Sequence, residues 1–559
     1  MTGDQLTRHV DAAVEAAVEH LLSRRKQSGG WSDVLSASPM TTALALLATV
    51  RADPDTRAED VRTSLAWLRA HQHPDGGWSV SDVHPPSSPG TTAIVAAVLQ
   101  ALDPEDSRDA VARAEEYVEA HGGDRVRAGR TGNGTRSWPA AVPIVRAAVG
   151  LAPVTAQPYQ PVEVMLLPPR LRDPIGIGLP VVLPLGLLHA HTLPAGRLRR
   201  AAQRRAEPAA LRWLRGVLHD NGGVSECPMI SALMVLGLHG AGVGADLCRR
   251  SLEYLRASRR PDGSWSLVRD IEVSATAYAV LAMAEVGDAA DGRLASTRRW
   301  LLDAQCGRFP PMRMPAGGWP SMLPSGWPDS EDTAMVLSCL GALGLTREHP
   351  AVDRGLRWLR SRQNMTGSWS LWIRDAPIVT DRPCPAVTAH AVMALRRYPP
   401  TPREQRSIRR ALGYLRRAQR RDGSYHSSWF RTSTFGTAKA LEAHAAVGRA
   451  GTAPAVRAGR WLLANQGADG GWSGGSGPAT AEETAWALYA LLAAGYPAGH
   501  AATVRAVRWL LDRQTAKGSW APAPVGLFFD DLVYADDLVA HAFPLRALAR
   551  WRVAAREAP

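Results

Sequence analysis

The sequence predicts an all-α protein made of two α/α toroid domains, and three features of its repeats lead to this prediction. A short glycine turn that ends in an aromatic residue recurs along the chain, usually with a glutamine ahead of it. In the C-terminal half these aromatic residues are about 47 to 56 residues apart, the length of a helix pair with its loops. Each turn follows a charged amphipathic segment and precedes a more apolar one. Outer charged helices paired with inner apolar ones are expected to close around a central cavity.

The turns predict where the two toroids lie. They occur at residues 27–31, 72–78, 260–265, 305–319, 363–369, 419–425, 466–472 and 514–520, with a degenerate copy at 221–224. Their glycines let the chain reverse, the glutamine can cap backbone groups, and the tryptophan can cover the turn. The regular copies predict one toroid over residues 266–559, and the irregular copies predict another over residues 21–265.

The inner helices of the second toroid have a common start. A Thr-Ala pair follows the turns at Thr276, Thr333, Thr388, Thr437 and Thr484. Because these pairs occupy equivalent places, we expect them to mark the rim of the central cavity.

One of these helix starts carries an unusual cluster of acids. Residues 327–334 read Trp-Pro-Asp-Ser-Glu-Asp-Thr-Ala, with carboxylates at Asp329, Glu331 and Asp332. Such residues suit the first turn of a helix, and the ordinary interpretation is a solvated acidic cap. In a dry site, however, three acids this close cannot all ionise easily, so one should keep its proton at neutral pH. The position at an inner-helix rim favours a general acid in an apolar pocket.

Composition restricts the other classes of function. The chain has 559 residues and a net charge of +13, but its arginines are spread over helix faces and no nucleic-acid motif is present. Its cysteines show no CxxC spacing, which fits a reducing cytoplasm and argues against a cysteine-rich zinc site; they are Cys227, Cys248, Cys306, Cys339 and Cys384. The polar N-terminus does not resemble a signal peptide, so a cytoplasmic location is expected.

The most apolar stretch, residues 175–188, is too short to span a bilayer, and we expect Pro180 and Pro184 to break it. A core or cavity-lining segment and a peripheral membrane contact are the two alternatives for it.

The turns and the acid segment together resemble the squalene–hopene cyclase and class II terpene cyclase superfamily, including its bacterial members, over nearly the whole chain. Residues 328–334 are similar to its acid motif, Pro-Asp-x-Asp-Asp-Thr-Ala, and residues 387–390 resemble the segment whose His hydrogen-bonds the acid. Residues 161–168 and 541–548 are similar to other segments of the family. The resemblance implies cyclisation of a linear isoprenoid, begun by protonation. The substrate would be a C15–C30 polyene, its epoxide or a prenyl diphosphate. The resemblance also implies that a helix at residues 1–20 packs on the second toroid.

The resemblance also implies roles for individual residues. Glu331 matches the family's proton donor, Asp329 and Asp332 would tune it, and His390 would orient and polarise it. Aromatic faces would stabilise carbocations, although each candidate has the alternative of a core or turn tryptophan; the candidates are Trp319, Trp327, Trp369 and Trp429. No metal or cofactor is expected, with Mg²⁺ only for a diphosphate substrate.

The sequence departs from the family in ways that predict a reshaped pocket. Glu331 replaces the usual Asp donor and is intrinsically a slightly weaker acid, so an epoxide is an easier target than an alkene. Ala386 stands where hopene cyclases carry an acid, and residues 272–277 lack the family's Trp-Asp pair.

Two other functions compete with the cyclase hypothesis. One is a catalytically inactive or ligand-binding toroid. The other is a zinc protein prenyltransferase subunit, which needs an Asp/Cys/His site. The C-terminal acids favour helix caps or solvated charges over a Mg²⁺ site; they are Asp530, Asp531, Asp536 and Asp537. The sequence does not predict the oligomeric state.

Overall fold

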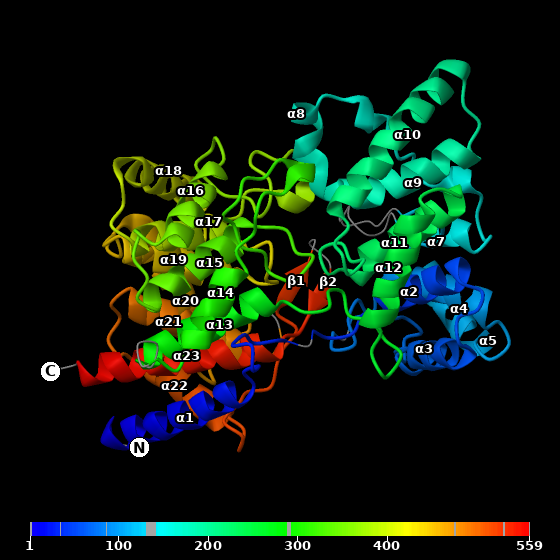
Figure 1. Cartoon of the computed structure of the whole chain (residues 1–559). Helices are drawn as coiled ribbons and strands as arrows, with labels where there is room; N and C mark the ends of the chain where they lie inside the picture. Colours follow the sequence, from blue (N-terminus) through cyan, green and yellow to red (C-terminus); the bar gives the residue numbers. More distant parts are fainter. Residues whose placement is uncertain are drawn as a thin grey trace.

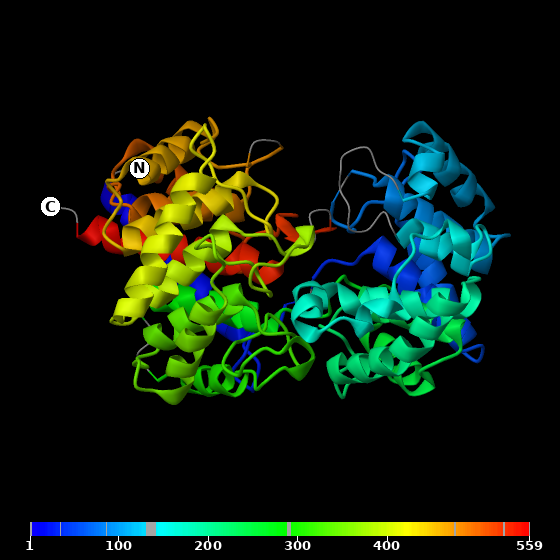
Figure 2. The ribbon, with the colours of Figure 1, turned by 90° about the horizontal axis from the view of Figure 1, so that it is seen from above.

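The protein consists of two lobes of paired helices that lie side by side (Figures 1 and 2). The computed structural model describes residues 3–33, 35–84, 86–129, 141–287, 292–474, 477–528 and 532–557. Within these ranges the sole strands are β1 (Gly526–Phe528) and β2 (Leu532–Tyr534), which pair antiparallel. The predicted all-α class with paired helices is confirmed.

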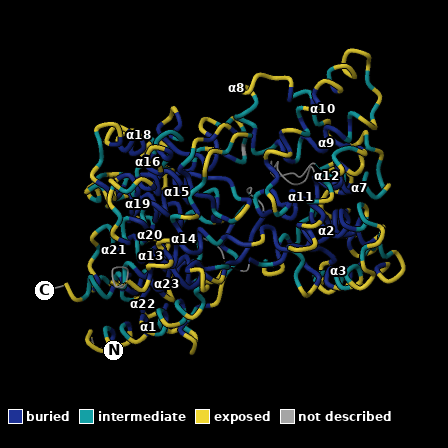
Figure 3. The backbone as a smooth tube through the Cα atoms, in the orientation of Figure 1, coloured by how far each residue is buried: buried dark blue, intermediate teal, exposed yellow. Residues whose placement is uncertain are grey.

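The second lobe is a closed ring of inner helices surrounded by outer ones. The inner helices are α13 (Glu272–Val286), α15 (Ser330–Ala342), α17 (Pro385–Arg397), α19 (Ser433–Ala446), α21 (Ala481–Ala493) and α23 (Asp537–Arg556). Each packs on the next, and α13 packs on α23, so the ring closes. The outer helices are α14 (Ala295–Asp303), α16 (Pro350–Ser361), α18 (Pro402–Ala418), α20 (Ala453–Ala464) and α22 (Ala501–Asp512). Buried residues line the interior of both lobes, and exposed ones follow the outer helices (Figure 3).

The N-terminal helix α1 (Gly3–Ser23) completes the outer layer of this second lobe rather than the first (Figure 1). The Gln514 side chain donates a hydrogen bond of 2.9 Å to the Ala13 carbonyl. The backbone N–H of Trp31 donates to the Thr276 hydroxyl on α13. The turn at 27–31 therefore belongs to the second lobe, and the prediction that it lies in the first toroid is wrong.

The first lobe is less regular. Its inner helices are α2 (Pro39–Ala52), α4 (Pro89–Leu102), α7 (Ala141–Ala148), α9 (Leu179–Thr192) and α11 (Pro228–Ala241). Around them lie α3 (Ala58–Ala70), α5 (Arg108–Ala120), α10 (Arg197–Val217) and α12 (Ala245–Ser258). Short pieces fill the stretch from α5 to α9, namely α6 (Asp124–Arg127), α8 (Pro169–Arg172) and the 3₁₀ turns Val154–Ala156, Val162–Leu166 and Asp173–Gly178. Further 3₁₀ turns lie at Pro310–Met312 and Val379–Asp381.

The expectation that Pro180 and Pro184 break the apolar stretch is wrong, because α9 runs through both. Pro180 lies in the first turn, where a missing N–H costs nothing, and Pro184 lies inside the helix. By length and composition Pro169–Thr192 could cross a membrane, with a hydropathy of 1.5. In the structure this segment is a series of short helical pieces followed by α9, and half of its most apolar window is buried.

Five repeat turns are held by the same three contacts, as the turn at 363–369 shows. The other four are at residues 72–78, 305–319, 419–425 and 466–472. The Gln363 amide donates to the Gly367 carbonyl and to the Ser407 carbonyl on the next outer helix, both at 2.9 Å. The backbone N–H of Trp369 donates to the Thr388 hydroxyl, at the start of the next inner helix. Gly367 has a φ of +93°, and a Cβ there would lie 2.6 Å from the Arg410 carbonyl oxygen. Each turn thus ties one helix pair to the next.

Candidate active site

The acid segment forms the buried N-terminus of α15. Asp329 is the N-cap, and its carboxylate accepts the backbone N–H of Asp332 at 2.8 Å. The N–H of Ser330 donates to the Leu371 carbonyl at 2.7 Å, so a neighbouring loop covers the helix start. None of the three carboxylate residues is more than 6% exposed. The segment begins a helix as predicted, but it is not a solvated cap.

His390 lies beside this segment, on the next inner helix, α17. Its Nδ1 is 2.9 Å from the Glu331 Oε1, although the angles fall short of those of a hydrogen bond. Both side chains are buried. The structure therefore brings together the two residues that the sequence analysis paired.

Burial controls the charge of the other two acids. It raises the pKa of Asp329 well above its usual value, and the charge of Asp332 raises it further. Burial also raises the pKa of Asp332 to about 7, against the lowering effect of the Ser274 hydroxyl, which donates to Asp332 at 2.6 Å. Burial and the charge of Asp332 thus both favour the protonated form of Asp329.

Glu331 and Asp332 line a cavity whose other walls are largely aromatic. Trp429 meets Trp372 edge-on, with ring centroids 5.3 Å apart, and lies 5.7 Å from Phe528. The enclosed space is about 50 Å³, too small for a whole C15 chain. A whole C15 chain would fit here only if the lining loops moved outward.

The predicted aromatic residues separate into two groups. Trp429 lines the cavity, but Trp319, Trp327 and Trp369 are not among its lining residues. Trp319 and Trp369 are fully buried in repeat turns, where their indole N–H groups donate to Leu301 and Leu359. Trp327 is buried near Phe309, with ring centroids 6.0 Å apart. These three occupy the turn or core positions that were the alternative for each.

Several residues of this region were missed from the sequence. Trp372, Phe528 and Tyr534 line the cavity from loops and the β-hairpin, outside the repeat pattern. Asp381 is buried, and its carboxylate accepts the N–H groups of Leu371, Trp372 and Ile373 at 2.7 to 3.2 Å. It holds the loop that carries Trp372, and burial raises its pKa to about 7. None of these residues belongs to the repeat pattern, so the repeats could not predict that they lie near the acid segment.

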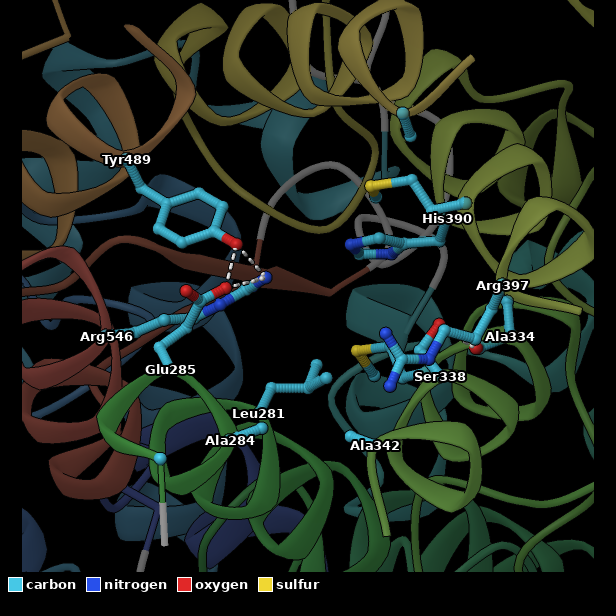
Figure 4. Close-up of a pocket in the computed structure, with 14 residues that line it drawn as sticks. Leu281, Ala284, Glu285, Ala334, Ser338, Ala342, His390, Arg397, Tyr489 and Arg546 are labelled. Carbon is cyan, nitrogen blue, oxygen red and sulfur yellow. Dashed lines mark hydrogen bonds and ion pairs between the residues drawn. The ribbon is translucent and has the colours of Figure 1, made fainter. Parts of the chain in front are cut away.

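A second cavity, of about 450 Å³, lies inside the ring behind His390 (Figure 4). Arg546 donates to the Tyr489 hydroxyl at 2.7 Å, and that hydroxyl also contacts Glu285. His390 and Arg397 lie across the cavity from this group (Figure 4). Because the aromatic cavity offers more ring faces to a cation than this polar one, it suits carbocation chemistry better. His390 lies between the two.

The C-terminal acids form no common site in the described part of the chain. Asp530 and Asp531 lie outside the described residues, Asp536 caps α23, and Asp537 is exposed. Among the described residues no group of three or more His, Cys, Asp or Glu side chains could hold a metal ion. Cys306, Cys339 and Cys384 are free thiols.

A closed α/α ring with Gln–Gly–Trp turns, and a buried acid cluster beside an aromatic cavity, define a terpene cyclase of the class II type. The family model "Squalene-hopene cyclase C-terminal domain" matches residues 271–553, and "Squalene-hopene cyclase N-terminal domain" matches residues 14–175. The chain belongs to the squalene–hopene cyclase family, and it is a terpene cyclase, an isomerase-type enzyme.

Individual relatives are similar at moderate identity. The squalene–hopene cyclase of Alicyclobacillus acidocaldarius is 29% identical over 97% of both chains. The drimenyl diphosphate synthase of Streptantibioticus cattleyicolor is 30% identical over 47% of this chain and 49% of its own. The structure of ent-copalyl diphosphate synthase from Streptomyces platensis covers 97% of this chain and 99% of its own. It has a TM-score of 0.56 and 21% identity, which supports the shared fold. These relatives do not favour the zinc prenyltransferase or the inactive toroid.

Proposed function

We propose that this protein cyclises a linear isoprenoid by protonating its terminal alkene or epoxide, with Glu331 as the proton donor. The observation that carries this proposal is the position of Glu331, in the wall of an aromatic cavity and 2.9 Å from His390. An alkene is a very poor base, so its donor must act in a dry site that stabilises the product charges. The Glu331 carboxyl gives its proton to the less substituted carbon of the terminal alkene, whose π electrons form the new C–H bond, and the cation forms on the dimethyl-substituted carbon. In an epoxide the proton goes to the oxygen, and the C–O bond to the dimethyl-substituted carbon breaks.

The neighbouring residues support this transfer in different ways. The raised pKa of Asp329 favours its neutral form, which reduces the negative charge that would oppose ionisation of Glu331. Ser274 fixes Asp332, and a protonated His390 would stabilise the carboxylate that Glu331 becomes. The rings of Trp372, Trp429 and Phe528 would face the cation without capturing it.

A substrate panel tests the activity and narrows the substrate class. Purified protein would be incubated with farnesyl diphosphate, geranylgeranyl diphosphate, squalene and their terminal epoxides, with Mg²⁺ or with EDTA. We expect a cyclic product from at least one substrate, and faster turnover of an epoxide than of its parent polyene, because the epoxide is the stronger base. Mass spectrometry of the extracts gives the result. A panel without any cyclic product would refute the proposal.

The first lobe also carries a surface suited to a lipid bilayer, and we propose that it docks there. Leu166, Leu167 and Leu171 are 42% to 57% exposed around α8, and Leu198 is exposed on α10. Arg170 and Arg172 lie among these leucines in the sequence. Exposed apolar side chains flanked by basic ones match an anionic lipid surface.

Vesicle sedimentation measures this contact. The double substitution Leu167→Asp and Leu171→Asp is expected to lower binding to phosphatidylcholine–phosphatidylglycerol vesicles about tenfold or more, because two charges would enter the interface. Met365→Asp is the matched control, because Met365 is exposed on the second lobe. Equal binding by both variants would rule out this surface.

A further inference from the structure

A third buried carboxyl lines the aromatic cavity, at Asp536. This residue lies just before α23 and shares the cavity wall with Glu331 and Asp332. Its Oδ1 caps the helix by accepting the N–H of Val539 at 2.8 Å. Its Oδ2 is buried and has no hydrogen-bond partner among the described residues. Among the described residues no lysine or arginine forms an ion pair with Asp536; Arg24 pairs instead with Asp33 and Asp537, each at 3.9 Å.

A helix cap needs only one of the two carboxylate oxygens. The other oxygen is left without a partner, which costs free energy in a buried site. Such an unpaired group in a folded protein calls for an explanation, and a functional role is one. A base in this cavity also has a direct consequence for the reaction, because a carbocation loses a proton to any base that reaches it. Of the three carboxyls in this wall, Glu331 is the proposed donor and Asp332 accepts the Ser274 hydroxyl at 2.6 Å, which leaves Asp536 as the candidate base.

We propose that Asp536 is the base that ends cyclisation. This inference rests on the proposed function. Glu331 gives a proton to the terminal alkene or epoxide, the cation forms on the dimethyl-substituted carbon, and ring bonds form as the cation moves along the chain. The last cation then loses a proton from an adjacent carbon to the Asp536 carboxylate, and the electron pair of that C–H bond forms the double bond of the product. Glu331 ends as a carboxylate and Asp536 as a carboxylic acid, so the proton count is unchanged, and exchange with water resets both.

The charge state of Asp536 is compatible with this role. Burial raises its pKa to about 7, against the hydrogen bonds from Val539 and Leu538 that lower it. An ionised fraction is therefore present at neutral pH, and the carboxylate is a stronger base than an exposed one.

Asp536→Asn separates the base from the helix cap. Asn caps helices about as well as Asp, so α23 should keep its start while the base is lost. The expected result is continued consumption of substrate, with the wild-type alkene reduced at least tenfold. Alcohols formed by water, or alkenes with the double bond elsewhere, would replace it. Asp537→Asn is the matched control, because Asp537 is exposed and does not line the cavity, and it should leave the products unchanged.

A binding measurement gives a second readout that needs no turnover. N,N-dimethyldodecylamine carries an ammonium that mimics the cation, and calorimetry at pH 8 would measure its affinity. Asp536→Asn is expected to weaken this affinity about tenfold, whereas Asp537→Asn should not change it. Thermal melting of both variants would check that the fold is intact.

The outcomes distinguish the two proposals. The first outcome is that wild type cyclises a substrate and Glu331→Gln does not, while Asp536→Asn keeps the products, rate and amine affinity of wild type. Asp536 would then be only a helix cap, so its role as a base would be refuted while the proposed function would stand. If wild type forms no cyclic product from the panel, the proposed function fails and the role of Asp536 fails with it.

Discussion

Glu331→Gln is expected to abolish cyclisation, with a fall in kcat of about 10³-fold or more. Gln has nearly the same shape, but an amide is far too weak an acid to protonate an alkene or an epoxide. The buried setting means that no water replaces the lost donor easily, because Glu331 is only 6% exposed. Product formation by mass spectrometry, with thermal melting as the check on folding, measures the effect.

The repeat supplies a matched control for this variant. Glu482 occupies the same place in the first turn of α21, within Thr-Ala-Glu-Glu-Thr-Ala, that Glu331 occupies in α15. It is also fully buried, and burial raises its pKa to about 7, but it does not line the aromatic cavity. Glu482→Gln should therefore keep cyclisation activity. Glu331→Asp should restore at least part of it, because Asp is again a carboxylic acid. If Glu331→Gln turned over substrate at the wild-type rate, Glu331 would not be the proton donor, and Asp332 or Asp329 would have to supply the proton.

The repeats made much of the second lobe predictable, because their contacts are short-range and recur. Gln363, Gly367 and Trp369 form one turn within seven residues, and their partner Thr388 begins the next inner helix. The acid segment could be placed at the ring because it follows such a turn, and its buried state follows from that place. Its pairing with His390 came from the resemblance to the family.

The other parts of the fold and of the cavity depend on contacts that the repeat pattern does not predict. Helix α1 closes the outer layer of the second lobe through Gln514, which is 501 residues away in sequence. The cavity walls at Trp372 and Phe528 come from loops between repeats, and Asp381 shapes one of them through three backbone N–H groups. Such contacts arise only when the ring has formed, so periodicity could not reveal them.

The tryptophans show how the repeat could have been used further. Trp319 and Trp369 end Gln–Gly–Trp turns, so the pattern itself assigned them a place in the turns. Trp429 lies outside such a turn, at the end of an irregular loop, and it is the one of the four predicted tryptophans that lines the cavity.

This division predicts opposite effects for two substitutions of the same type. Trp369→Ala is expected to lower the free energy of unfolding by about 3–5 kcal/mol, because it empties a fully buried site and removes the hydrogen bond to the Leu359 carbonyl. Its effect should be a lower melting temperature with unchanged products from the protein that remains folded. Differential scanning calorimetry and product analysis of the same samples would separate the two quantities.

Trp429→Ala should reverse this pattern. Trp429 meets Trp372 and Phe528 in the cavity wall, so its loss enlarges the space around the cation and removes an aromatic face. Cyclisation is then expected to stop earlier and to give a mixture of products. The loss of stability should be smaller than for Trp369→Ala, because the new space adjoins an existing cavity.

Substitution by Phe at each position sharpens the comparison, because Phe keeps an aromatic face but has no indole N–H. Trp429→Phe should retain most of the wild-type product, whereas Trp369→Phe should still melt early. If Trp369→Ala changed the products and Trp429→Ala did not, the aromatic cavity would be the wrong place for the reaction, and the polar cavity behind His390 would have to hold the substrate instead.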